Sequence, residues 1–276
     1  MAPPRPRVWP VFLTFALILP IAGVLTAIAL IAVIGLEHIL EGDAVGMLTL
    51  PALLVAIGVT EVVLLGAVLV AARPLTRARL RLQRGRASLG VLVAATLGAV
   101  TLSQVLDTIA VVAGFGRTGV LPMLSGTLER AHGGGLVTAL LVVALLAGLA
   151  EELFFRGFMQ TRLARRWSSR TAVLVTAVCF GAIHMDPVQS PLAFCLGIWL
   201  GFVCERAGSL WPGIAAHVAN NAVATLFASV GIPLVVTAAT ALVFVACLLW
   251  LRRALPPAPP EAPAGPSIPP VAAAPV

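Results

Sequence analysis

The chain has 276 residues, of which 60% are hydrophobic and 11% are charged, and its mean hydropathy is +1.05. These values lie far outside the range of water-soluble domains and are typical of a protein that crosses a membrane several times. The net charge of +7 comes from 18 arginines and no lysine against 11 acidic residues. The sequence has no basic patch interleaved with aromatic residues, so nucleic acid is not an expected partner.

Apolar segments predict the fold class. A helix needs about 20 apolar residues to cross the ~30 Å hydrocarbon core of a bilayer. Eight candidate segments occur, of which the fifth and sixth are short, and they predict an all-α polytopic membrane protein with about eight transmembrane helices. The first is too long for a signal peptide and lacks a small-residue cleavage site, so we expect it to be retained. The segments are residues 8–36, 47–72, 88–114, 136–155, 171–184, 191–204, 210–230 and 233–251.

Loop charges agree with this topology if both termini are cytoplasmic. Arginines collect in cytoplasmic loops, and this orientation places 16 of the 18 on that side. Only Arg117 and Arg130 then lie outside, together with five of the acidic residues. The arginine-only, Ala/Pro/Val-rich composition further suggests a high-GC bacterial genome. We therefore expect a multi-pass protein of a bacterial inner (plasma) membrane.

The chain divides into four parts on this basis. Residues 1–135 hold three spans and a basic loop at 73–86, and residues 136–230 hold the polar motifs described below. Residues 231–254 form the last span. The Pro/Ala-rich tail, 255–276, is expected to be extended and disordered, because repeated prolines cannot sustain a helix. The four cysteines show no pairing pattern and are expected to be small buried hydrophobes.

Few polar residues remain at membrane depth, where ionisable groups usually serve a function. Glu61 and Asp107 are isolated, and a carboxyl satisfied by a neighbouring helix is the simpler explanation for each. The other polar residues fall into pairs four apart, a spacing that places both members on one helix face. These pairs are Glu152 with Arg156, Phe180 with His184, and His217 with Asn221.

Glu151 differs from its neighbour Glu152 in direction. Adjacent helical residues are rotated by roughly 100° about the axis. Glu152 is therefore expected to pair with Arg156, while Glu151 faces elsewhere and is free for chemistry. Asn220, next to Asn221, is expected to serve packing or to support the site as a donor.

This set of side chains suits hydrolysis of a peptide bond. The reaction needs a water, a group that takes its proton, and donors for the charge that develops on the carbonyl oxygen. Glu151 can take the proton, His184 can hold or polarise the water, and the remaining pair can donate to the oxyanion. No HExxH zinc motif and no GxSxG nucleophile elbow occurs, and the only Gly-Asp pair lies in a predicted loop. A Glu/His water-activating site is what remains.

The order of these motifs resembles a known family. EELFFR (151–156), FGAIH (180–184) and HVANN (217–221) are similar to the EExxxR, FxxxH and HxxxN motifs of the CPBP intramembrane proteases. This group, also called the CAAX-protease or Abi family, includes Ras-converting-enzyme-type proteases. The stretch GSLWPGIAAH (208–217) also resembles the family, and the resemblance covers residues 136–227.

The resemblance implies roles for the motif residues. Glu151 and His184 would activate the water, and His217 and Asn221 would form the oxyanion site, with Glu152 and Arg156 in support. Family members are commonly labelled metalloproteases, and Glu151, His184 and His217 are candidate zinc ligands. We favour a metal-free site that requires no cofactor.

Three functions follow as hypotheses. The first is an intramembrane endopeptidase that cleaves a membrane-associated protein or peptide near the cytoplasmic side of the bilayer. A prenylated CAAX substrate is not expected in a bacterium. The second is a non-catalytic protein of the same fold, acting as a bacteriocin-immunity factor or a membrane scaffold. The third is a proton-coupled transporter that uses Glu61, Asp107 and Glu151.

Overall fold

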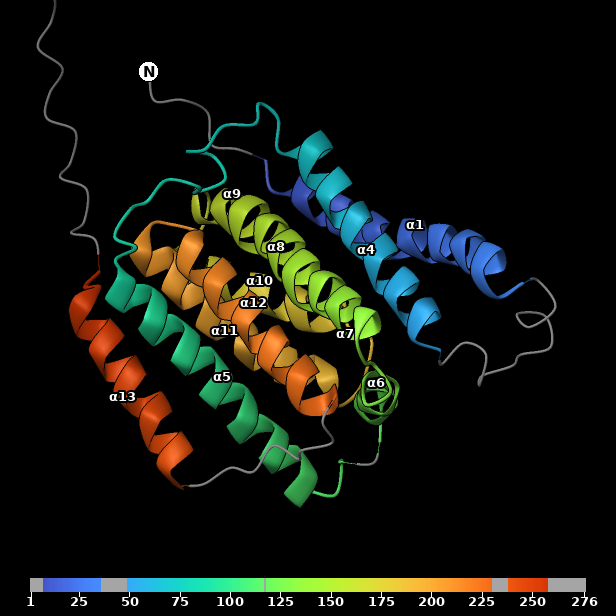
Figure 1. Ribbon diagram of the computed structural model, residues 1–276. Coiled ribbons are helices and arrows are strands. Elements are labelled where there is room, and N and C mark those ends of the chain that lie inside the picture. Colours follow the sequence, from blue (N-terminus) through green and yellow to red (C-terminus); the bar gives the residue numbers. More distant parts are fainter. Residues whose placement is uncertain (1–6, 36–48, 117, 230–237, 258–276) are drawn as a thin grey trace, which may run out of the picture.

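The computed structural model describes residues 7–35, 49–116, 118–229 and 238–257 (Figure 1). In these ranges the regular elements are all helices, which confirms the all-α class. The acidic loop after the first span and the Pro/Ala-rich tail from residue 258 lie outside the described residues.

The bundle begins with three long helices. In chain order these are α1 (Trp9–Ile34), α4 (Leu50–Ala71) and α5 (Leu89–Val112), followed by the short α6 (Val120–Leu128). One continuous helix, hereafter the composite helix, then comprises α7 (Gly134–Ala139), η1 (Leu140–Leu146), α8 (Ala147–Glu152), η2 (Leu153–Gln160) and α9 (Thr161–Ala164). The last four are α10 (Ser169–Ala182), α11 (Gln189–Ala207), α12 (Trp211–Ser229) and α13 (Ala238–Ala254).

Five of the described helices are long and apolar enough to span a membrane: α1, α4, α5, the composite helix and α11. The expected number of eight is therefore not confirmed. The other three expected segments do form helices, but α10 has 14 residues and α13 has 17. The helix α12 has 19 residues, and its His217, Asn220 and Asn221 lower its hydropathy. By contrast, α11 is longer than the short segment expected there, and it is long and apolar enough to span a membrane.

The composite helix lies at the centre of the bundle, with α12 beside it (Figure 1). On one side α4 packs against it and carries α1 on its outer face, while α5 and α13 pair on the opposite side. The helices α10 and α11 pack against each other behind the centre. The three helices that carry the sequence motifs, namely the composite helix, α10 and α12, thus meet inside the bundle.

Aromatic side chains of η2 fill the core between the composite helix, α1 and α10. Phe154, Phe155 and Phe158 are buried. The Phe155 ring lies 6.2 Å from that of Phe15 on α1 and 5.2 Å from that of Phe180 on α10, both edge-on. This cluster fixes the position of η2, and therefore of the neighbouring α8.

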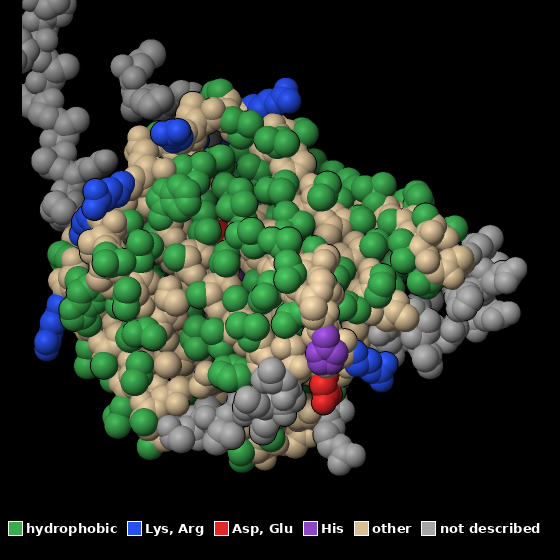
Figure 2. Space-filling view, in the orientation of Figure 1, with side chains coloured by type: hydrophobic (Ala, Val, Ile, Leu, Met, Phe, Trp, Pro, Cys, Tyr) green, Lys and Arg blue, Asp and Glu red, His purple; other side chains and the backbone are tan. Residues whose placement is uncertain are grey.

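The outside of the bundle is apolar. Figure 2 shows a face covered by hydrophobic side chains, with charged side chains mainly at its margins. Large hydrophobic residues are exposed along α1, α4, α5 and α13. A soluble protein does not expose continuous apolar surface of this extent, whereas lipid-facing helices must do so. The molecule is therefore a membrane protein.

A glycine allows α5 and α11 to approach closely. Trp199 of α11 packs against Gly98 of α5, and a Cβ at position 98 would overlap the indole ring. The indole N–H donates to the carbonyl oxygen of Ala95 at 3.0 Å. Small residues have this role at helix contacts in membranes, where the backbones must come near each other.

Asp186 organises the connection between α10 and α11. Its carboxylate accepts hydrogen bonds from the backbone N–H groups of Val188 (2.9 Å) and Gln189 (2.7 Å) at the start of α11, and from that of Val120 (2.7 Å) on α6. Burial acts to raise the pKa of Asp186, but these backbone donors and the nearby His184 outweigh it and hold the pKa below its ordinary value. The connection between the two helices is thus held in place by one charged side chain.

The lowered pKa of Asp186 makes this end of the bundle sensitive to acid. A carboxyl with a depressed pKa in the folded state contributes stability above its unfolded value of about 3.9, and the contribution is lost as the pH falls through the folded value. The Tm of the parent protein in detergent, followed by tryptophan fluorescence, should therefore fall more steeply below about pH 4 than that of Asp186→Asn. Parallel curves for the two proteins would refute this role, and Glu129→Gln, which changes an exposed acid, serves as the control.

Candidate active site

Two π-helical segments flank the paired glutamates. Glu151 and Glu152 end α8, between η1 and η2. The Thr161 hydroxyl donates to the carbonyl oxygen of Arg156, five residues earlier, at 2.9 Å. Although π-helical turns are rare in proteins, those that occur are often found at functional sites. They also change the direction of side chains relative to a regular helix, so sequence spacing alone does not place the residues of this region.

Glu152 and Arg156 form a fully buried ion pair. Both side chains have an exposed fraction of 0%, and Nη1 of the arginine lies 2.6 Å from Oε1 of the glutamate. Nη2 donates to the carbonyl oxygen of Gly197 on α11 at 3.1 Å, and the guanidinium carbon lies 4.4 Å from the centre of the Phe180 ring. The expected pairing is confirmed. The topology prediction had counted Arg156 among the cytoplasmic loop charges, and its complete burial corrects that assignment.

His217 of α12 lies between the two glutamates. Its Nδ1 is 3.1 Å from Oε1 of Glu152, and its Nε2 is 3.4 Å from Oε2 of Glu151. Only 3% of the His217 side chain is exposed. A neutral imidazole donates from one nitrogen only, whereas the protonated ring donates from both. The two adjacent acids are therefore joined by one ring, an arrangement that the sequence spacing did not predict.

His184 follows the last turn of α10. Its Nδ1 lies 2.8 Å from the carbonyl oxygen of Phe180, so Nδ1 carries the proton and donates it. In a neutral ring with this tautomer, Nε2 keeps a lone pair and is an acceptor. The Phe180 ring meets both histidines edge-on, at 5.3 Å from His184 and 5.7 Å from His217. Phe180 therefore holds the two imidazoles apart.

A cavity of about 250 Å³ lies between α4, α8 and the end of α10. Its polar lining residues are Glu151, His184, Glu61 and Thr60. Glu61 is 3% exposed, and its buried Oε2 has no hydrogen-bond partner among the residues that the structure describes. The sequence linked Glu61 to Glu151 only through the transport hypothesis, because Glu61 lies on a helix far earlier in the chain and belongs to no pair. Its place beside the hydrolytic motif residues, and that of Thr60, could not be read from the spacing.

Asn221 is held by hydrogen bonds to η1 and to its neighbour Asn220. Its Nδ2 donates to the carbonyl oxygen of Val143 on η1 at 3.1 Å, and its Oδ1 accepts from Asn220 at 3.4 Å. Asn221 is not among the residues that line the cavity. An amide nitrogen carries two hydrogens, so one N–H remains beyond the bond to Val143. The oxyanion role of Asn221 stays a prediction.

The structure thus joins the predicted residues in two groups. Glu151, Glu152, Arg156 and His217 form one network of contacts, and Glu151 and His184 line one cavity. Asp107 of α5 is outside the lining of that cavity. The cavity that Glu61 and Glu151 share therefore does not include Asp107, whereas the transport hypothesis uses all three carboxyls.

The arranged side chains do not form a zinc ligand set. A catalytic zinc site needs three protein ligands around one point, with a fourth position for water. Among the described residues, no three His, Cys, Asp or Glu side chains are grouped to hold a metal ion. Each ring nitrogen of His217 lies instead beside a carboxylate.

Comparison with known families places the central part of the chain beside one of them. Residues 133–223 match the family model described as type II CAAX prenyl endopeptidase, Rce1-like. This finding confirms the resemblance that the three motifs indicate, and its range contains all six motif residues but not Glu61. No curated protein and no solved structure matches the chain.

The first test of this site concerns the buried arginine. Arg156→Met should lower the free energy of unfolding by about 3–5 kcal/mol, because it leaves the Glu152 carboxylate buried without its partner. The double variant Glu152→Gln/Arg156→Met should lose much less, since it removes both charges. Denaturant titration in mixed micelles measures both values. Equal losses in the two variants would show that packing, and not charge, sets the stability here.

A second test concerns Glu61. Glu61→Leu should raise the free energy of unfolding by about 1–3 kcal/mol, because it removes a buried oxygen that has no partner, while hydrolytic activity falls. A site residue commonly trades stability for function in this way. Thr60→Val is the matched control, because Thr60 lines the same cavity but its hydroxyl already donates to Ala56 at 3.0 Å. A loss of stability in Glu61→Leu would contradict a functional role.

Proposed function

Because residues 133–223 match the Rce1-like CAAX-endopeptidase family, we propose that the protein is an intramembrane endopeptidase. It hydrolyses a peptide bond of a membrane-associated protein or peptide with a water activated by Glu151 and His184. The observation that carries the proposal is that both side chains line one cavity inside a bundle of membrane-spanning helices.

The first step is activation of water. His184 accepts a hydrogen bond from the water at Nε2, since its Nδ1–H is engaged by Phe180. Glu151 takes a proton from the same water as the oxygen attacks the carbonyl carbon of the scissile bond. The Glu152 and Arg156 pair holds the end of α8, which fixes the position of Glu151 relative to the cavity.

The second step is collapse of the tetrahedral intermediate. Once Glu151 is protonated, it attracts Nε2 of His217 less strongly. An N–H at Nε2 can then donate a hydrogen bond to the oxyanion instead. Asn221 would supply a further donor through its second N–H only after its side chain turns from η1 toward the cavity. Glu151 then gives its proton to the leaving amine nitrogen, the C–N bond breaks, and Glu151 returns to its carboxylate form. Glu61, across the cavity, can hold the water that replaces the one consumed.

The substrate follows from the position of the cavity. It lies between helices that span the membrane, so a substrate must reach it from the bilayer or from its surface. The description of the matching family names a CAAX prenyl endopeptidase, although a prenylated substrate is not expected in a bacterium. A suitable probe is therefore a quenched fluorescent peptide that ends in a farnesylated CAAX sequence, used beside the same peptide without the farnesyl group.

The decisive variant is Glu151→Gln. Loss of a general base costs about 10²- to 10⁴-fold in rate, so cleavage of either probe by the purified full-length protein should fall at least about 100-fold while the Tm stays near the parental value. Asp107→Asn, which changes a carboxyl outside the cavity, should cleave at the parental rate.

The same measurement separates the alternatives. Parental cleavage by Glu151→Gln would refute the mechanism. A scaffold or immunity role predicts that the parent protein cleaves neither probe and that Glu151→Gln keeps its biological effect. Proton-coupled transport predicts that Asp107→Asn is as harmful as Glu151→Gln.

A further inference from the structure

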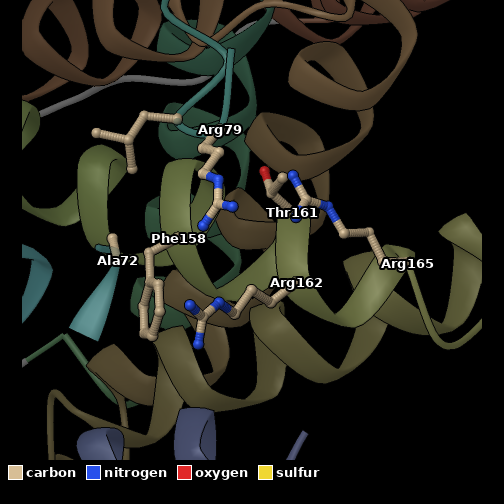
Figure 3. Close-up of a pocket in the computed structure, with 7 residues that line it drawn as sticks. Ala72, Arg79, Phe158, Thr161, Arg162 and Arg165 are labelled. Atoms are coloured by element: carbon tan, nitrogen blue, oxygen red, sulfur yellow. The ribbon is translucent and has the colours of Figure 1, made fainter. Parts of the chain in front are cut away.

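Three arginines converge on a hollow at the end of the bundle, away from the candidate active site. Arg79 belongs to the loop after α4, Arg162 to α9, and Arg165 follows α9. Figure 3 shows their guanidinium groups turned toward the same space, with Phe158 and Thr161 beside it. Ala72 and Leu80 complete the lining of this arginine hollow.

The charge in the arginine hollow has no counter-charge among the described residues. The lining contains no acidic residue, and no ion pair of these three arginines is found among the described residues. The Arg162 guanidinium instead stacks 5.1 Å from the centre of the Phe158 ring, and Nη1 of Arg79 donates to the carbonyl oxygen of Arg73 at 3.3 Å. Three like charges around one space repel each other, and a bound anion would relieve that repulsion.

The position of the hollow favours a lipid as the source of the anion. Ala72 directly follows the spanning helix α4, and Arg162 belongs to the last turn of the composite helix, so the hollow lies where two spans end. Large apolar side chains, Leu69 and Val70, are exposed on the last turn of α4. The same region therefore offers apolar surface for acyl chains and guanidinium groups for a headgroup.

The arginine hollow has a volume of about 10 Å³, which leaves room for little more than one oxygen atom. From these observations we infer that the arginines at its mouth bind the phosphodiester of an anionic phospholipid, such as phosphatidylglycerol, in the leaflet at this end of the bundle. Guanidinium groups suit the task because their planar forks bind two phosphate oxygens at once. Basic pockets between spans are known to select anionic headgroups on the cytoplasmic side. The inference does not depend on the proposed hydrolysis.

The chain offers a matched pair of variants for the test. Arg162→Gln/Arg165→Gln removes two charges from the hollow. Arg77→Gln/Arg84→Gln removes two charges from the same basic end, at exposed positions that do not line the hollow. The two variants have the same net charge, so general attraction to an anionic surface is reduced equally in both.

Native mass spectrometry of the full-length protein, with phosphatidylglycerol or phosphatidylcholine added to the micelles, measures the binding. We expect the parent and Arg77→Gln/Arg84→Gln to retain phosphatidylglycerol, and Arg162→Gln/Arg165→Gln to bind it at least about tenfold more weakly. Equal weakening in both double variants, or equal retention of the two lipids by the parent, would overturn the proposal. Soluble glycerol phosphate forms the third arm, and competition by it at the same concentration would assign the hollow to free phosphate esters instead of lipid.

Discussion

The buried ion pair of Glu152 and Arg156 is the interaction on which the rest of this structure depends. Two charges removed from water are costly unless each finds its partners, and here the guanidinium finds them on three helices. It pairs with the acid on its own helix, donates to the backbone of α11 and lies on the ring of Phe180 from α10. Through His217 the acid also reaches α12. One pair thus fixes the relative positions of the four helices that surround the site.

This arrangement explains why two adjacent acids can have different tasks. Glu152 has no exposed surface and is committed to structure, whereas Glu151 is 12% exposed and borders the cavity. His217 contacts both glutamates. A change of charge on Glu151 therefore changes the electrostatic interaction with the imidazole ring that also contacts Glu152. Structure and chemistry are therefore coupled through a single imidazole.

Much of this could be predicted from the sequence, and the remainder has a physical reason. The spacing of four residues predicted the contacts of Glu152 with Arg156 and of Phe180 with His184, because each contact lies within one helix or at its end. Contacts between helices follow no such period. The approach of His217 to both acids, the turn of Asn221 toward Val143 and the presence of Glu61 in the cavity all depend on how distant segments pack. The count of eight spans was not confirmed because α10, α12 and α13 are too short or too polar, which apolar stretches alone did not reveal.

The length of the composite helix also has a consequence for where a substrate would be cut. Its 31 residues measure about 46 Å, half as long again as the ~30 Å hydrocarbon layer. Glu151 lies 17 residues after Gly134, about 26 Å along the axis. A helix of this length must tilt or emerge from the bilayer. If the helix enters the hydrocarbon layer at Gly134 and emerges on the other side, Glu151 lies near that aqueous boundary, and under the proposed function a substrate would need to unwind only the last turns of its own membrane segment to present a bond.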